Sequence, residues 1–404
     1  MPLHFRLLSA ARAAVASPAG RWLRRRHGWL LVGLWALMQL LQLVQNHGPR
    51  HMHDSARYLY YARQIADGWQ FAGGHNLRYV GYPLFMALWL KLGTGWWGIV
   101  LAQVALSGLA ARAFYATMRR LTPSPVDWLP AALATAALVG WPDVQRFNWF
   151  LLTESLFISA LVFVFWALVR VRRPASGRWL LLVATLVLFG AVRPNGFIAT
   201  AAAALAGLAY LWQRPGQRAF RWSLAGLALL APLGWWVLNK LLFTFTLIET
   251  YLQGNVIGGY NGWLLEPTEP LWFPPADLKP VLRLVYFMAA NPFYFGKLAV
   301  LKGLTLFFYI KSYYSWSHIL LIVLFIYPSY WLAWRGLRGA SWLPARTFLA
   351  AVIGLQTVMV MMTIDDWDVR FIVPLLPCIF ALAGLAVARS AELQQPLSAA
   401  GAGD

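Results

Sequence analysis

The sequence predicts an all-α polytopic integral membrane protein with about ten transmembrane helices, organised as one domain over residues 1–404. The first observation is composition: 60% of the residues are hydrophobic and the mean hydropathy is +0.57. Only 12% are charged, about half the share typical of soluble domains. The second is that apolar runs of about 18 to 25 residues, each long enough to cross a bilayer, recur along almost the whole chain.

Charged and turn-forming residues delimit these runs. In chain order, the predicted spans cover about 28–44, 96–118, 129–141, 147–169, 179–192, 197–212, 222–247, 317–334, 343–363 and 371–388. The apolar stretch 82–92 is short for a span, so it is predicted to be an interfacial helix in a first outer loop, 45–95. A second long outer loop covers 249–315. Its segment 293–310 is long enough to cross, but its lysines are unfavourable in lipid, so we place it at the interface.

The formal net charge of +20 arises mainly from Lys and Arg in short connecting loops. That is the positive-inside pattern, so the charge reports membrane topology and does not indicate a nucleic-acid partner. With both termini inside, all of the 14 acidic residues except Asp127, Glu392 and Asp404 fall on or near the outer side. The pattern predicts a bacterial inner (cytoplasmic) membrane protein whose chemistry lies on the periplasmic face. A single cysteine, Cys378, excludes an internal disulfide.

Polar side chains are concentrated in residues 51–62, directly after the first span. A carboxylate, a guanidinium, two imidazoles and three phenols so close to hydrocarbon indicate a functional site. A helix is predicted to begin at Asp54, and helical spacing puts Arg57, Tyr58 and Tyr61 on the side of Asp54. Asp54 is either a helix N-cap alone or also a general base at the membrane surface; the two roles are compatible.

Further short motifs follow along the chain: Arg57-Tyr58 after Asp54, Leu77-Arg78-Tyr79, Tyr82-Pro83, Leu152-Thr153-Glu154 at the fourth span, Arg193-Pro194-x-Gly196 after the fifth, and Arg370-Phe371-x-x-Pro374 at the last. In their order and topological positions they resemble the GT-C superfamily of glycosyltransferases. The branch they resemble most contains the dolichyl-phosphate-mannose protein mannosyltransferases and the bacterial aminoarabinose transferases. The latter carry a Glu-Lys pair before the proline, where this chain has Gly81 and Tyr82.

The resemblance implies a GT-C type fold, a donor sugar on a polyprenyl monophosphate (undecaprenyl phosphate in bacteria), and Asp54 as the catalytic base. It places Glu154 near a second acidic position that holds the acceptor or orients basic groups. The chemistry fits these residue types, because a phosphate monoester leaves without a general acid and one carboxylate suffices to deprotonate the acceptor. Direct displacement through an oxocarbenium-like state inverts the anomeric centre.

The leaving phosphate needs fixed cations. The basic candidates on the predicted outer side are Arg57, Arg78, Arg193, Lys297, Lys302 and Arg370. Arg193 and Arg370 are favoured because each ends or begins a span at the expected height, although each can instead be an interfacial anchor. Glu154 lies inside its span, where an unpaired carboxylate is unfavourable, so we expect it to pair with Arg146 or Arg193.

Contacts to sugar or acceptor are assigned to His53, Tyr58, Tyr61, Tyr82, Tyr260 and Trp263. The last two belong to a Gly- and Pro-rich region, 254–275, which is either a lid over the active cavity or a passive covering loop.

Two stretches of the sequence contain residue types that can bind a metal ion. His51, His53 and Asp54 are a chemically reasonable ligand set but lack a clear fourth ligand, so no cofactor is expected. The segment Asp365-Asp366-x-Asp368 could hold a divalent ion, contact the acceptor or form a solvated outer turn.

The sequence thus predicts an inverting membrane glycosyltransferase that moves one sugar from a polyprenyl-phosphate carrier to a hydroxyl of a lipid, glycan or protein, with membrane lipids around it and no nucleic acid. Two alternatives remain open. One is a flippase or transporter of a polyprenyl-linked lipid, and the other is a ligase or polymerase with a pyrophosphate donor, which more often needs a metal. A flippase should place polar residues through the depth of several spans, whereas here they gather at the outer edge.

Overall fold

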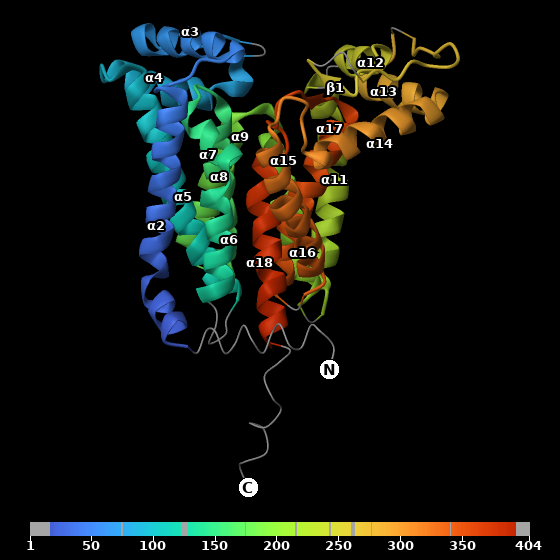
Figure 1. Ribbon diagram of the computed structural model, residues 1–404. Helices are drawn as coiled ribbons and strands as arrows, with labels where there is room; N and C mark the ends of the chain where they lie inside the picture. The colour runs from blue at the N-terminus through green and yellow to red at the C-terminus, as the bar shows by residue number, and fades with distance from the viewer. Residues whose placement is uncertain are drawn as a thin grey trace.

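The computed structural model describes residues 17–73, 76–122, 128–173, 175–214, 216–241, 244–259, 263–275, 277–339 and 341–392. The protein is an all-α polytopic membrane protein, as the sequence predicts, and its spans form an upright bundle (Figure 1).

The longer helices are α2 (Pro18–Asn46), α5 (Gly95–Leu121), α8 (Thr153–Val171), α9 (Ser176–Val192), α10 (Phe197–Trp212), α11 (Arg218–Leu241), α14 (Pro292–Phe308), α17 (Leu343–Met362) and α18 (Leu376–Glu392). The shorter ones are α3 (His53–Gly68), α4 (Gly81–Lys91), α6 (Trp128–Gly140), α7 (Pro142–Arg146), α12 (Thr244–Leu252), α13 (Pro280–Ala290), α15 (Trp316–Leu321) and α16 (Tyr327–Leu337). Brief turns are η1 (Asn76–Tyr79), η2 (Phe147–Trp149), η3 (Pro194–Gly196), η4 (Ile322–Ile326) and η5 (Val373–Leu375), and β1 (Ile257–Gly258) pairs in parallel with β2 (Asp365–Asp366).

Within the described residues, seven helical segments are long and apolar enough to cross a membrane, and three shorter apolar helices accompany them. Each of the ten predicted spans coincides with one of these segments. The pair α13 and α14 is bent by 102° at its break, so the segment 293–310 does not continue α13 as a straight crossing. Figure 1 shows α12, α13 and α14 at the end of the bundle where α3 and α4 lie; we call this the outer end.

Helix α3 lies across the outer end of the bundle and packs on α4 (Figure 1). This packing buries Tyr58 and Tyr61 together with Leu59 and Ala62. Tyr58 and Tyr61, which helical spacing puts on the side of Asp54, are therefore buried and do not face solvent. Their rings are large apolar surfaces, and a neighbouring helix removes them from solvent despite the phenol.

Candidate active site

Arg370 brings two predicted acidic residues together. Its Nε donates to Oε1 of Glu154 at 2.6 Å, and its Nη1 donates to Oδ2 of Asp54 at 2.9 Å. Arg193 adds a second cation, with its Nη1 3.1 Å from the same Glu154 oxygen. Asp54, Glu154, Arg193 and Arg370, which come from four separate parts of the sequence, thus form one ion-pair network, which we call the Arg370 centre. Glu154 pairs with Arg193 as expected and not with Arg146.

Hydrogen bonds to the backbone hold the chain segments that carry Asp54 and Glu154 next to each other. Arg50 forms a parallel bridge to Phe150, with the amide of Arg50 bonded to the carbonyl of Trp149. The hydroxyl of Ser55 donates to the carbonyl of Leu151 at 2.9 Å. These bonds join the start of α3 to the start of α8. Because each acid lies in the first turn of its helix, the joined helix starts bring the two carboxylates close together. The positive end of a helix dipole stabilises a carboxylate at this position.

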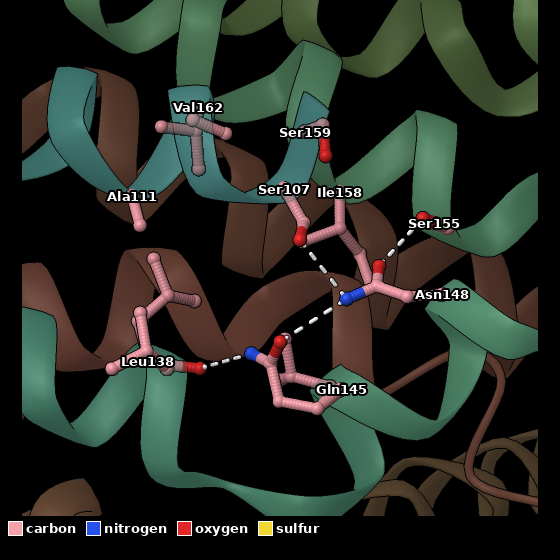
Figure 2. A pocket seen from close by; sticks show the side chains of 12 residues that line it. Ser107, Ala111, Leu138, Gln145, Asn148, Ser155, Ile158, Ser159 and Val162 are labelled. Carbon is pink, nitrogen blue, oxygen red and sulfur yellow. Dashed lines mark hydrogen bonds between the residues drawn. The ribbon is translucent and has the colours of Figure 1, made fainter. Parts of the chain in front are cut away.

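Buried amides fix the turn that precedes α8. Figure 2 shows Asn148 between Ser107, Gln145 and Ser155, to which it is hydrogen-bonded at 3.1, 3.1 and 2.6 Å. Gln145 also accepts from Gln39 of α2 at 2.6 Å. The cavity between these side chains holds about 20 Å³, which is room for one water molecule. The network rigidifies the segment that carries Glu154.

The segment that carries Arg370 is anchored on both sides. Asp365 accepts from Lys311 at 3.0 Å, and Asp368 accepts from Arg146 at 2.6 Å. Both carboxylates are buried, so the solvated turn considered for the segment is not what forms. Asp366 instead faces Arg370, with its Oδ2 4.0 Å from Nη1 of the arginine.

Burial and charge compete at this centre. Burial lowers the pKa of Arg370, but the charges and hydrogen bonds of Glu154, Asp54 and Asp366 together outweigh it and raise the pKa, so the guanidinium stays charged. Burial raises the pKa of Asp366, against the opposing effects of hydrogen bonding and of Arg370. Tyr58 is held neutral, because burial and then the negative charge of Glu154 raise its pKa to about 12.

The other predicted phosphate ligands divide into two groups. The guanidinium of Arg57 lies 5.3 and 5.2 Å from the ring centroids of Tyr58 and Tyr79, beside the η1 turn that carries Arg78. Lys302 is fully buried, donates to the carbonyl of Thr363 and lies over the ring of Tyr251.

Lys302 therefore packs the outer loop and does not face a phosphate site, which corrects the prediction. Lys297 is exposed on α14, and no contact described for it leads to the centre.

Three residues that were predicted to contact the sugar instead make hydrogen bonds or packing contacts inside the protein. Tyr61 donates to the carbonyl of Ala72, and Tyr82 is fully buried and donates to Gln103 at 2.9 Å. Both are therefore core residues in this structure, which corrects their assignment to the sugar. Tyr58 also packs in the core, but its position close to Glu154 keeps it next to the centre.

Gly81 allows α4 to pack closely on α9. A Cβ at this position would lie 2.8 Å from the backbone of Ala191 in α9, so no side chain fits without displacing the helix.

The remaining predicted contacts lie on the surface or outside the described residues. His53 is exposed at the start of α3, and Trp263 is about half exposed; Tyr260 lies outside the described residues. In the described part of the chain, no three His, Cys, Asp or Glu side chains lie close enough to hold a metal ion. His51 instead packs on Trp96. The expectation that no cofactor is needed stays a prediction.

A second buried polar cluster was not predicted as a site. Asp143 of α7 accepts from Tyr309 at 2.8 Å and lies 3.3 Å from Nε2 of His318. The ring of His318 stacks on Tyr314. The signal in the sequence was an acid in the outer turn beside Pro142, but its partners lie far along the chain, so sequence spacing cannot pair them.

An apolar groove opens between α6, α16 and α18. It holds about 460 Å³ and is lined by small residues such as Ala137, Gly140 and Gly384, with Trp141 and Pro142 at its outer end.

No protein-family model matches the sequence, and no curated protein matches it. The solved structure of ArnT from Cupriavidus metallidurans in the apo state is similar to 92% of this chain, with a TM-score of 0.49 and 15% sequence identity. The chain spans 60% of the length of that protein. A similarity this remote says nothing about substrates, so function has to be inferred from the residues of the Arg370 centre.

Proposed function

We propose that this protein is an inverting membrane glycosyltransferase that moves one sugar from a polyprenyl-phosphate carrier to an acceptor hydroxyl at the outer, periplasmic face. The observation that supports it is the position of Arg370 between Asp54 and Glu154 at the outer end of the spans. One accessible carboxylate beside a fixed guanidinium is what sugar transfer requires when a polyprenyl phosphate monoester is the leaving group.

Exposure separates the roles of the two acids. The side chain of Asp54 is 31% exposed, whereas that of Glu154 is fully buried between two arginines. An acceptor hydroxyl can reach Asp54 but not Glu154. Asp54 is therefore the general base, and Glu154 is a positioning residue that holds Arg193 and Arg370 in place.

Arg370 changes partners during the proposed reaction. The donor phosphate competes with Asp54 for Nη1 of Arg370, and its binding releases the carboxylate to act as a base. The acceptor O–H proton then passes to Asp54 while the oxygen attacks the anomeric carbon. The bond from that carbon to the phosphate oxygen breaks, and its electron pair leaves with the phosphate, whose charge Arg370 stabilises.

The groove between α6, α16 and α18 supports a lipid carrier. It is almost wholly apolar, and its outer end lies next to α7, where Arg146 pairs with Asp368. Asp368 is two residues from Arg370 in the chain. A prenyl chain in this groove would thus present its phosphate near the Arg370 centre.

The flippase remains the second candidate, and the placement of charge favours the enzyme. The buried carboxylates of the described residues, Asp143, Glu154, Asp365 and Asp368, lie at or beyond the ends of spans and not along their depth. A path for a charged headgroup needs polar groups through the membrane.

The test is transfer of label from radiolabelled polyprenyl-phosphate sugars, with purified protein in nanodiscs and membrane extract as acceptor. We expect Asp54→Asn to lower turnover by about 10²- to 10⁴-fold, the range for loss of a general base. Asp67→Asn, an exposed acid of the same helix, is the matched control. Equal activity of Asp54→Asn and wild type would refute the mechanism, and donor consumption by neither would favour the flippase. Loss of activity with a chelator would favour the pyrophosphate-dependent ligase.

A further inference from the structure

A hollow of about 370 Å³ opens beside the segment that carries Arg370. Its walls come from the second outer loop, which includes the end of α14, from α15 and from Trp367 in the segment before α18. Trp263, Phe308, Tyr313 and Trp367 line it, and each is about half exposed. Large aromatic rings left half exposed around one concave site are typical of a binding surface and are unusual as isolated surface residues.

Local packing places Trp367 in this wall. The amide of Trp367 donates to the carbonyl of Gly258 at 2.9 Å, next to the parallel pair of β1 and β2. Gly259 has a φ of +73°, and a Cβ there would lie 2.7 Å from Cδ1 of Trp367. Tyr313 meets the indole edge to face, with centroids 5.6 Å apart. The glycine is thus required for the indole to lie where it does.

The charge of the hollow is balanced. Lys311 lines it, but its ammonium group bonds to Asp365 and to the carbonyl of Asp366, both at 3.0 Å. A lysine neutralised in this way offers little attraction to a phosphate. The aromatic faces, with Lys311 and the hydroxyl of Ser312 among the lining groups, suit a neutral polyhydroxylated ring, which stacks its C–H face on an indole.

The hollow is adjacent to the Arg370 centre and separate from it. Asp366 turns its side chain toward Arg370, while its neighbour Trp367 lines the hollow. A donor sugar is attached to the phosphate, so it must lie at the arginine itself. A second sugar, one whose hydroxyl points toward Asp54, is what the hollow can hold.

We propose that the hollow binds a sugar ring of the acceptor, so that the acceptor is a glycan or glycolipid. This inference rests on the proposed function, since it names the acceptor class of the same reaction. Trp367 and Trp263 form its stacking surfaces.

The test is direct binding, measured by saturation-transfer-difference NMR on the detergent-purified protein with a panel of neutral methyl glycosides. We expect at least one glycoside to give signals from its ring protons with wild type and with Asp54→Asn. Trp367→Ala should weaken its affinity about tenfold, and Trp367→Phe should retain most of it. Trp272→Ala is the control, because Trp272 is an exposed indole of the same loop outside the hollow.

Binding does not depend on turnover, so the two proposals can fail separately. Glycoside binding that Trp367→Ala weakens, in a protein without transferase activity, would support the hollow and refute the donor chemistry. Transfer activity without glycoside binding, or binding that Trp367→Ala and Trp263→Ala leave unchanged, would overturn the acceptor site. Thermal unfolding midpoints of all variants show whether a loss reflects misfolding.

Discussion

The Nε atom of Arg370 lies 2.6 Å from Oε1 of Glu154, although 216 positions separate the two residues in the chain. The same guanidinium reaches Asp54, 316 positions away. One side chain therefore joins the first outer loop, the start of α8 and the segment before α18, and several predictions depend on it.

Arg370→Ala should destabilise the protein by about 3–5 kcal/mol, because it leaves Asp54 and the buried Glu154 without their shared partner. Arg370→Lys should recover part of the stability but little of the transfer activity, since an ammonium group cannot bond two carboxylates as a planar fork does. Thermal unfolding in detergent and the transfer assay measure the two effects. Arg63→Ala, an exposed position of α3, is the control. Full activity of Arg370→Lys would contradict a role in holding phosphate.

Arg193 and Glu154 should be energetically coupled. Arg193→Met and Glu154→Gln each break the buried pair, so each should destabilise by more than an ordinary surface change. The double variant should be less destabilised than the sum of the single ones, with a coupling of about 0.5–3 kcal/mol. A double-mutant cycle on unfolding midpoints measures it. Strict additivity would show that the two groups do not interact.

Ser55→Ala should lower turnover without touching substrate. Its hydroxyl accepts from the amide of Met52 and donates to the carbonyl of Leu151, so its loss loosens the start of α3 where Asp54 lies. The expected loss of stability is about 1 kcal/mol, as for other helix caps. We expect kcat to fall while KM for the donor stays unchanged. Ser55→Thr should restore part of the lost kcat. A change in KM alone would argue against a positioning role.

Asp366→Asn should stabilise the protein at pH 7. Burial raises the pKa of Asp366 above its value in the unfolded chain, so the folded state favours the protonated acid. The stabilisation that the protonated Asp366 side chain gives to the folded state is therefore fully present below the unfolded pKa of about 3.9. It is lost as the pH rises through the pKa of Asp366 in the folded state. The extra stability of Asp366→Asn over wild type should therefore decrease as the pH falls toward about 4.

Unfolding midpoints across this pH range test the Asp366 prediction, with the exposed Asp277→Asn as control. A destabilised Asp366→Asn at pH 7 would mean that attraction to Arg370 outweighs burial.

Hydropathy alone located the spans, because each must satisfy its backbone within one apolar run. The edges of the spans also placed Asp54, Arg193 and Arg370 at a similar depth in the membrane, whereas Glu154 and the role of Asp54 came from the family resemblance. The depth of a residue in the membrane does not, however, indicate which other helices lie beside it.

The partners of Lys302, Lys311 and Asp143 therefore could not be predicted, since which helices are neighbours is decided by packing between distant segments. The burial of Tyr61 and Tyr82 was missed for a related reason. A tyrosine carries both a polar hydroxyl and a large apolar ring. Whether the ring is buried in the core or the hydroxyl faces solvent depends on where α4 packs.

The order of synthesis gives the Arg370 centre a further property. Asp54 is synthesised early, Glu154 at the start of the fourth span, and Arg370 only just before α18, the last of the described spans. Until that last helix inserts, Glu154 has Arg193 alone and Asp54 has no guanidinium partner. A chain truncated before Arg370 would thus contain most of the described spans and still lack the guanidinium that joins Asp54 to Glu154.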